Sequence, residues 1–333
     1  MDSATTLKLA IAGAMLTASF AASASDKPTL NVYTYDSFVS EWGPGPQLKT
    51  AFEEQCGCTL NFVAAEDGVS ILNRARVEKS NTQADVLLGL DNGLMTEATQ
   101  LGLVQSHNVD TSKITSDLNW NNNQFVPFDY GYFAFIYDAE KIKAPVSSFE
   151  ELLASNATII YQDPRTSTPG QGLMTWVNKA YGDDTTSAWA EIAEQTVTVT
   201  KGWWEAYSLF LEGGSDYVLS YTTSPAYHVV AEGKNQYKAA EFTDGHVAQV
   251  EVAAISAYSD QTELANQFLE FLISKEAQQI LPVTNWMLPV VDGVELPKAF
   301  NQLVTPKQIN LGADELAQNR ARWIREWRTA VSQ

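Results

Sequence analysis

Hydrophobic and polar positions along the first third of the chain follow two alternating periods. Residues 29–35 and 59–66 alternate in the way that is typical of half-buried strands, and residues 84–90 form a short apolar run typical of a buried strand. Between them, residues 45–55 and 69–80 carry their apolar positions at helical spacing, as amphipathic helices do. The pattern therefore predicts a β-α-β-α-β unit with a parallel sheet.

The same order of elements returns in the middle of the chain. We expect strands at 157–163, 197–201 and 216–221, separated by helices at 172–181 and 205–214. No sequence repeat and no Pro-rich or Gly/Ser-rich linker separates this unit from the first. The sequence thus predicts two α/β units.

Two further segments, residues 125–138 and 246–258, are long and extended enough to join the two units. If each of them passes from one unit to the other, the chain forms two lobes connected by crossing hinge strands. The expected lobes are residues 25–125 with 246–285, and residues 126–245 with 286–333.

The start of the chain has the features of an export signal. An apolar run follows Lys8 and ends in Ala22-Ser23-Ala24, the small-x-small pattern at which signal peptides are cleaved. Ser and Thr interrupt this run, which is short for a membrane span, although an uncleaved anchor helix is the alternative. We predict that residues 1–24 are a signal peptide and that the mature chain is exported.

The composition is that of an acidic globular protein. The chain has 333 residues, of which 45% are hydrophobic, enough for the cores of two lobes. Its 40 Asp and Glu residues against 21 Lys and Arg give a formal net charge of -19. A nucleic-acid partner is therefore not expected, because phosphate binding needs a clustered basic surface. The acidic balance favours solubility and attracts a cationic ligand only weakly.

The two cysteines of the chain are Cys56 and Cys58, with one glycine between them. In an oxidising compartment they can form a small disulfide, and a reduced pair is the alternative that the sequence leaves open. Two thiols without a nearby His or a further Cys do not make the usual four-ligand zinc set. No metal site is predicted.

Polar and aromatic side chains collect where the predicted strands end. Tyr35 ends the first strand, Asp67 and Gly68 follow the second, and residues 162–172 and 220–228 follow strands of the second unit. In open α/β sheets, ligands bind beyond the carboxyl ends of the strands. We therefore expect a binding site to be built from these segments.

Two of these segments contain predicted helix starts. In the first, Thr168 is expected to be the N-cap and Pro169 the first helical residue, which leaves the backbone N–H groups of residues 170–172 pointing outward. Ser224 and Pro225 offer the same arrangement in the second. Such a helix start accepts a phosphate or a carboxylate, and a plain helix cap is the alternative.

Four tryptophans lie in turn-like surroundings. Trp42, Trp203, Trp204 and Trp286 each lie close to Gly, Asn or Pro, whereas core aromatics fall within periodic segments. Rings in such places can stack on a flat ligand. Loop anchors that pack on their own lobe are the alternative.

Motifs of the common enzyme classes are absent from the sequence. It contains no G-x-x-x-x-G-K-[ST], no G-x-S-x-G, no H-E-x-x-H and no C-x-x-C, and His107, His228 and His246 do not cluster along the chain. We therefore predict a binding protein without catalytic residues and without a cofactor.

Several of these segments together resemble the periplasmic thiamine-binding proteins of ABC importers. The likeness is carried by VYTYDSF, WGPGP, EDGVS, YQDPRTSTPG, LSYTTSPAYH and NWM, and it extends from about Lys27 nearly to the end. It implies a type II periplasmic-binding-protein fold, a periplasmic location, and thiamine with its mono- and diphosphate as ligands. The residues whose motifs resemble the family's ligand contacts are Tyr35, Trp42, Asp67, Gly68, Ser167, Trp203, Tyr221, Tyr227 and Trp286.

The resemblance also implies partners, namely a membrane permease and a separate ATPase. The doubled Trp203-Trp204 departs from the family pattern, so the sequence leaves open which ring faces the ligand. A ferric-ion binder of the same fold class is one alternative, although Tyr221 and Tyr227 are not adjacent as such a site would want. A thiamine-degrading enzyme of related fold is another, and it would need a nucleophile that the CGC segment is poorly placed to supply.

Overall fold

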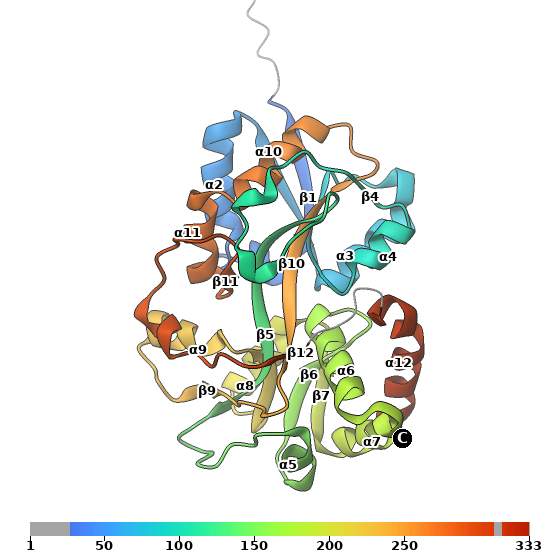
Figure 1. Cartoon of the computed structure of the whole chain (residues 1–333), viewed down its shortest axis with the longest axis vertical. Helices are drawn as coiled ribbons and strands as arrows, with labels where there is room; N and C mark the ends of the chain where they lie inside the picture. The colour runs from blue at the N-terminus through green and yellow to red at the C-terminus, as the bar shows by residue number, and fades with distance from the viewer. Residues whose placement is uncertain (1–26, 310–314, 333) are drawn as a thin grey trace, which may run out of the picture.

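Two long strands connect the two halves of the molecule (Figure 1). The computed structural model describes residues 27–309 and 315–332, so the predicted signal peptide lies outside the described residues. Strands β5 (Val126–Asp138) and β10 (His246–Ser256) are antiparallel neighbours and run from one half into the other. They are the crossing strands that the sequence predicts, and the α/β, two-lobed architecture is confirmed.

Parallel strands flanked by helices form the first lobe. Strand β1 (Thr29–Tyr35) pairs in parallel with β2 (Thr59–Ala65) and with β3 (Val86–Asp91). Strand β3 is buried along its whole length, as a central parallel strand should be. The other elements of this lobe are α1 (Asp36–Val39), α2 (Gly45–Cys56), α3 (Gly68–Glu78), α4 (Met95–Gln100), β4 (Val104–Gln105), α10 (Thr262–Leu272), α11 (Lys275–Thr284) and β11 (Leu288–Pro289).

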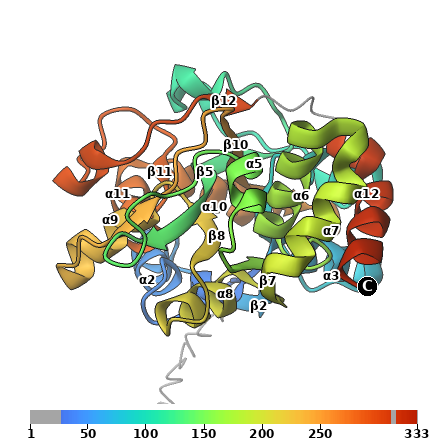
Figure 2. The same cartoon turned by 90° about the horizontal axis from the view of Figure 1, so that it is seen from below.

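The second lobe repeats this plan. Strand β6 (Ile159–Gln162) pairs in parallel with β7 (Thr196–Thr200) and β8 (Tyr217–Tyr221), and β8 is antiparallel to β5. Its other elements are α5 (Phe149–Ala154), α6 (Thr168–Tyr181), α7 (Thr185–Gln195), α8 (Trp203–Leu211), α9 (Ser224–Tyr227), β9 (Tyr237–Ala239), β12 (Gln308–Ile309) and α12 (Glu315–Val331). Figure 2 shows α6, α7 and α12 together on one side of this lobe. No helix in the described part of the chain is long and apolar enough to span a bilayer.

Each lobe has its own hydrophobic core. Strand β5 contributes Phe128 to the core of the first lobe and Phe135 to the core of the second. Trp176 of α6 and Trp327 of α12 are buried in the second core, so the C-terminal helix packs on this lobe. The exact residue boundaries expected for the lobes stay a prediction.

Both predicted helix starts are wrong by one residue. Helix α6 begins at Thr168, because Ser167 has the extended backbone of an N-cap and its hydroxyl accepts a hydrogen bond from the backbone N–H of Gly170 at 3.4 Å. Helix α9 likewise begins at Ser224 and follows Thr223. Neighbouring hydroxyl residues look alike in a sequence pattern, and only the backbone angles show which of them is already helical.

Cys56 and Cys58 form a disulfide at the turn between α2 and β2. The structure thus answers the redox question that the sequence left open. Gly57 between them has a φ of 60°, the left-handed region that glycine adopts without steric cost.

Candidate ligand-binding site

A cleft between the two lobes gathers most of the predicted site residues. It contains about 940 Å³ of empty space including its opening to solvent, a size suited to a small molecule. Its lining residues are Tyr35, Ser37, Trp42, Asp67, Thr168, Pro169, Trp203, Trp204, Tyr207, Tyr221, Ser224, Tyr227, Glu251, Thr284, Asn285, Trp286 and Met287.

Of the predicted ligand contacts, Gly68 and Ser167 do not line the cleft but lie directly behind its wall. A Cβ atom on Gly68 would lie 2.3 Å from the carbonyl oxygen of Gly89 and 2.7 Å from Cγ2 of Thr168. A glycine is therefore needed where the lobes meet. Ser167 is fully buried, and its hydroxyl donates a hydrogen bond to Asp67.

The carboxylate of Asp67 joins the starts of two helices from different lobes. It caps α3, since Oδ1 accepts from the backbone N–H of Gly68 at 2.7 Å. Oδ2 accepts from the hydroxyl of Ser167 at 2.8 Å, and Oδ1 also accepts from the backbone N–H of Thr168 at 3.3 Å and from its hydroxyl at 3.1 Å. The partial positive charge of both helix N-termini stabilises this carboxylate.

The expectation of outward-pointing N–H groups at the start of α6 is therefore wrong. The N–H of Gly170 donates to the hydroxyl of Ser167, and the N–H of Gln171 donates to its carbonyl oxygen at 3.1 Å. Residues 170–172 are buried within the helix. An anionic ligand would have to compete with Asp67 for the donors at this end of the cleft.

Tryptophan rings from both lobes meet at one side of the cleft. The ring centroid of Trp42 lies 4.8 Å from that of Trp204 and 6.3 Å from that of Trp203. Trp203 stacks on Tyr207 with centroids 5.0 Å apart, and its Nε1 donates to the hydroxyl of Ser220 at 2.7 Å. Trp204 is 43% exposed. Both rings line the cleft, and of the two Trp203 is the one held in a fixed orientation from behind.

Trp286 and Tyr227 form a further aromatic edge. Their ring centroids are 5.4 Å apart with the planes at 71°. The φ angle of Trp286 is 56°, a left-handed conformation that bulky residues rarely adopt. Backbone strain of this kind is concentrated at ligand sites, which supports a functional position for this ring.

Glu251 of β10 lines the bottom of the cleft, and the buried Asp129 of β5 lies opposite it in the neighbouring crossing strand. The hydroxyl of Tyr35 donates to Oε2 of Glu251 at 2.8 Å, and Nδ2 of Asn285 donates to Oδ2 of Asp129 at 2.6 Å. Burial raises the pKa of Asp129 to about 7. Burial, and then the charge of Asp129, raise the pKa of Glu251 well above its usual range. Because the described lining contains no Lys or Arg, the cleft favours a cation over an anion.

The predicted site residues do not include Asp129, Glu251 or Asn285. A signal for the two acids was present, since each lies inside a predicted, mostly apolar crossing strand, where a buried charge is costly unless it is paired. Asn285 has no comparable signal. The remaining lining residues not singled out as ligand contacts are Ser37, Thr168, Pro169, Trp204, Tyr207, Ser224, Thr284 and Met287.

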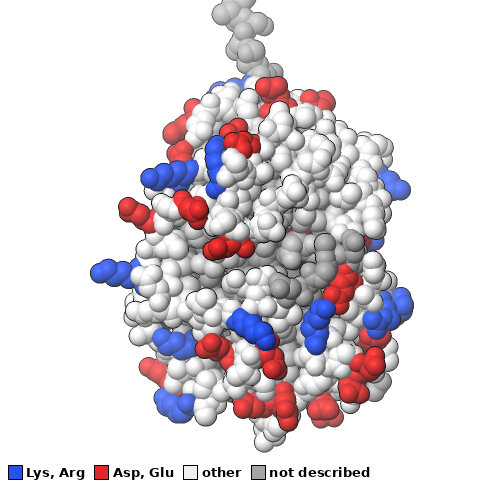
Figure 3. All heavy atoms as spheres, in the orientation of Figure 1, with Lys and Arg blue, Asp and Glu red and all other residues white. Residues whose placement is uncertain are grey.

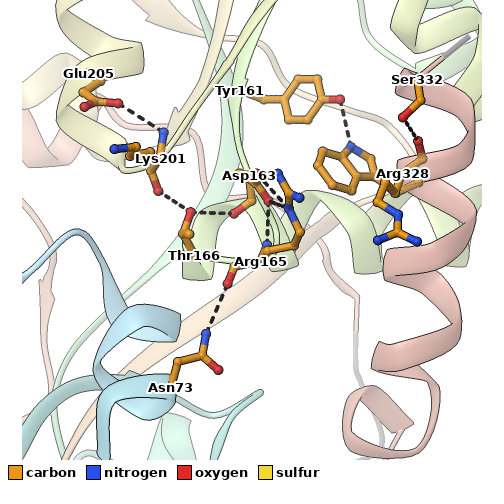
Figure 4. A network of polar contacts seen from close by, with 10 residues as sticks. Asn73, Tyr161, Asp163, Arg165, Thr166, Lys201, Glu205, Arg328 and Ser332 are labelled. Carbon is orange, nitrogen blue, oxygen red and sulfur yellow. Dashed lines mark hydrogen bonds and ion pairs between the residues drawn. The ribbon is translucent and has the colours of Figure 1, made fainter. Parts of the chain in front are cut away.

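The lobes also touch at a second place (Figure 4). Nδ2 of Asn73 on α3 donates to the carbonyl oxygen of Arg165, in the loop before α6, at 3.3 Å. The carbonyl oxygen of Thr166 accepts a hydrogen bond from the backbone N–H of Ser70 in α3 at 3.1 Å. The hydroxyl of Thr166 donates to the carbonyl oxygen of Lys201, in its own lobe, at 2.6 Å. Because these contacts join the two lobes, the structure is that of a closed form.

An ion pair also crosses between the lobes. Arg320 of α12 pairs with Glu97 of α4, and Arg76 of α3 lies 3.8 Å from the same carboxylate. The side chain of Arg320 is only 11% exposed, so solvent screens this pair less than an ordinary surface pair.

One face of the outer surface carries mixed charges. On the face drawn in Figure 3, acidic and basic side chains are dispersed over both lobes. This face offers no continuous basic area of the kind that nucleic acids bind.

The tyrosines that a ferric site would use are engaged separately. The hydroxyl of Tyr221 donates to Gln249 at 2.8 Å, whereas that of Tyr227 donates to Glu232 at 3.4 Å. Within residues 27–309 and 315–332, no group of three or more His, Cys, Asp and Glu side chains is arranged to hold a metal ion.

Comparison with known proteins identifies the family of the chain. Residues 47–306 match the family described as bacterial extracellular solute-binding protein. The chain is 55% identical over 309 residues to the thiamine-binding periplasmic protein of Escherichia coli K12, covering 92% of this chain and 94% of that one. It is 46% identical over 316 residues to the thiamine-binding periplasmic protein of Brucella suis, covering 94% of this chain and 95% of that one.

Solved structures agree with the sequence comparison. A periplasmic thiamin binding protein with 54% identity superposes with a TM-score of 0.90 over 92% of this chain and 97% of that chain. A ferric binding protein from Campylobacter jejuni gives a TM-score of 0.76 over 90% of this chain and 99% of that chain, at 19% identity. The second likeness shows a shared fold alone.

Proposed function

Because the chain belongs to the bacterial extracellular solute-binding proteins, and among them to the thiamine-binding periplasmic proteins, we propose that it captures thiamine between its lobes in the periplasm and delivers it to an ABC importer. The observation that carries this proposal is the cleft itself, which combines aromatic walls from both lobes with the acidic residues Asp67 and Glu251 and has no basic residue in its described lining.

Thiamine has the chemistry that such a cleft can recognise. It joins a flat aminopyrimidine to a thiazolium ring with a permanent positive charge, and it carries a hydroxyethyl tail. Trp and Tyr faces can stack on the pyrimidine and attract the cation, each desolvated cation–π contact contributing about 2 kcal/mol. The acidic groups of Asp67 and Glu251 add attraction for the same charge.

Individual roles follow from position. Trp203 and Trp42 provide faces from opposite lobes, and Tyr227 with Trp286 closes another edge. Tyr35 and Tyr221 contribute rings whose hydroxyls are bound to Glu251 and Gln249. Gly68 and Ser167 act from behind the wall by holding Asp67 in place.

Thiamine monophosphate and thiamine diphosphate are part of the proposal. Their tails need hydrogen-bond donors, and the N–H of Gly68 and the hydroxyls of Ser167 and Thr168 are available only if they leave Asp67. A phosphate would therefore bind in competition with this carboxylate. We expect the affinities of the three forms to report that competition.

The partners are a membrane permease and a separate ATPase. The relatives are substrate-binding proteins and the sequence has no phosphate-binding loop, so the energy for uptake is supplied elsewhere. The purified chain is expected to hydrolyse no ATP and to leave thiamine intact.

The test is calorimetric titration of the mature chain with thiamine, its monophosphate and its diphosphate, followed by recovery of the ligand. One site per chain and unchanged thiamine are expected. Absence of heat at high micromolar thiamine would remove the proposal, and cleaved thiamine would favour the enzyme instead. Titration with ferric citrate is the control for the other alternative and should give no binding.

A further inference from the structure

Three acidic residues stand in one row across neighbouring strands. In the antiparallel pairing of β10 with its two neighbours, Glu251 lies opposite Asp91 of β3 on one side and opposite Asp129 of β5 on the other. Residues that face each other in this way project to the same side of a sheet, and like charges placed directly opposite are destabilising. The protein tolerates this arrangement at the bottom of its cleft.

The three acids differ in their hydrogen-bond partners, although burial raises the pKa of Asp91 to about 7 as it does that of Asp129. Asp91 turns away to the start of the following helix, where Oδ1 accepts from the N–H groups of Gly93 at 3.0 Å and Leu94 at 3.1 Å. Among the described residues, the carboxyl pair of Asp129 and Glu251 has neutral donors: Asn285 for both acids, and Tyr35 and Gln249 for Glu251. No Lys or Arg among the described residues forms an ion pair with either member.

One oxygen of the pair could be satisfied by a proton between the two carboxyl groups. Oδ1 of Asp129 is buried and meets no hydrogen-bond donor among the described residues. Glu251 can hydrogen-bond to Asp129 only when one of the two carboxyls is protonated. A single proton between them would satisfy this oxygen and remove the repulsion between two buried charges.

The surroundings keep that proton in place when the cleft holds no cation. The groups that face the pair are Asp67 before α3, Asp91 of β3, Tyr35 of β1, Tyr221 of β8, Gln249 of β10 and Asn285 after α11. Burial raises the pKa of Asp129 to about 7, and burial followed by the charges of Asp129, Asp67 and Asp91 raises the pKa of Glu251 well above its usual range. Within the described residues, the positive charge that acts on this row is that of Arg320, which lowers the pKa of Asp91.

We propose that Asp129 and Glu251 share one proton in the ligand-free protein and release it to solvent when a cationic ligand binds, so that this pair selects a cation over a neutral molecule of similar shape. The inference rests on the proposed function and identifies what the cleft recognises. Glu251, Tyr35 and Asn285 line the cleft, so a positive charge stacked there lies close to the pair. A nearby positive charge lowers the pKa of both carboxyls and makes the doubly ionised pair the stable form.

Because proton release is linked to ligand binding, it determines whether the affinity rises or falls with pH. The free protein holds more protons than the complex, so affinity rises with pH until the free pair loses its proton unaided. Over the range in which one proton is released, the dissociation constant should fall about tenfold for each pH unit. Above that range it should level off.

The experiment is calorimetry of thiamine binding to the mature wild-type chain in two buffers with different ionisation enthalpies, from about pH 6 to about pH 8, on either side of the value of about 7 for Asp129. Release of about one half to one proton per bound thiamine is expected near neutral pH. Thiamine binding with no proton release anywhere in this range would overturn the inference and leave the proposed function standing. Absence of thiamine binding would overturn both.

Substitutions within the row of three acids test whether the released proton comes from the carboxyl pair. Asp129→Asn should abolish proton release, and its loss of affinity relative to wild type should grow as the pH rises. Glu251→Gln should do the same if Asp129→Asn fails to fold. Asp91→Asn is the matched control, because Asp91 is buried in the same row but accepts hydrogen bonds from the backbone N–H groups of Gly93 and Leu94 instead of sharing a proton with Glu251; this variant should still release a proton. Equal proton release by wild type and the folded pair variant would contradict the assignment.

Discussion

Ser167, the N-cap of α6 in the second lobe, donates a hydrogen bond of 2.8 Å to Asp67, the N-cap of α3 in the first lobe. Each helix start thus depends on a residue of the opposite lobe. The contact exists only while the lobes are closed, and it lies in the wall of the cleft in which we propose that thiamine binds. Ligand capture and lobe closure therefore share the same atoms.

Replacing this carboxylate should weaken binding. Asp67→Ala leaves the buried donors of Gly68, Ser167 and Thr168 without their acceptor, and it removes a negative charge from the cleft. We expect the affinity for thiamine to fall at least about tenfold, a loss of about 1.4 kcal/mol. Calorimetry measures this directly.

Asp67→Asn is the control for that change. Its amide oxygen can still accept hydrogen bonds at the start of α3, but the charge is gone. An affinity between those of wild type and Asp67→Ala would show that the hydrogen bonds of residue 67 and its negative charge each contribute to binding. Wild-type affinity in Asp67→Ala would contradict the role given to this residue.

The two neighbouring tryptophans should differ in their contribution. Trp203 is held by Tyr207 and Ser220, so its face is already oriented, whereas Trp204 is 43% exposed at the opening. Trp203→Ala should lower thiamine affinity by at least about tenfold, and Trp204→Ala by only a few-fold. Equal losses in titrations of the two variants would show that the orientation of Trp203 gives it no advantage.

Much of the framework could be predicted because it depends on local patterns. The apolar run that became β3 and the extended segments that became β5 and β10 are visible in the sequence, and so are the tryptophans beside turn residues. Their shared cleft could be expected because strand ends of an α/β sheet converge. Local signals thus indicated the architecture, and seven of the 17 residues that line the cleft are among the predicted ligand contacts.

The carboxyl pair could not be predicted in the same way. Asp129 and Glu251 meet only because β5 and β10 pair in one particular register, and a sequence without pairing information does not contain that register. The occupied start of α6 was missed for a related reason, since its occupant, Asp67, comes from the other lobe. Contacts between distant segments set the electrostatics of the cleft.

Weakening the ion pair between the lobes should open the ligand-free protein. Glu97→Gln removes the charge that pairs with Arg320 and lies near Arg76, so open forms should become more populated. Solution scattering should then show a larger radius of gyration without ligand, which saturating thiamine restores. Glu326→Gln is the matched control, because Glu326 pairs with Arg322 within α12 and spans no lobe boundary. An identical change in both variants would argue against a role in closure.

The binding of thiamine between the tryptophan faces is tested most directly by intrinsic fluorescence of the mature chain during a thiamine titration. Trp42, Trp203, Trp204 and Trp286 line the cleft, whereas Trp176 and Trp189 are buried in the second lobe and provide an unaffected background. If thiamine binds between these rings, the fluorescence should be partly quenched, and the quenching should saturate with one thiamine per chain. Emission that stays unchanged up to high micromolar thiamine would contradict it.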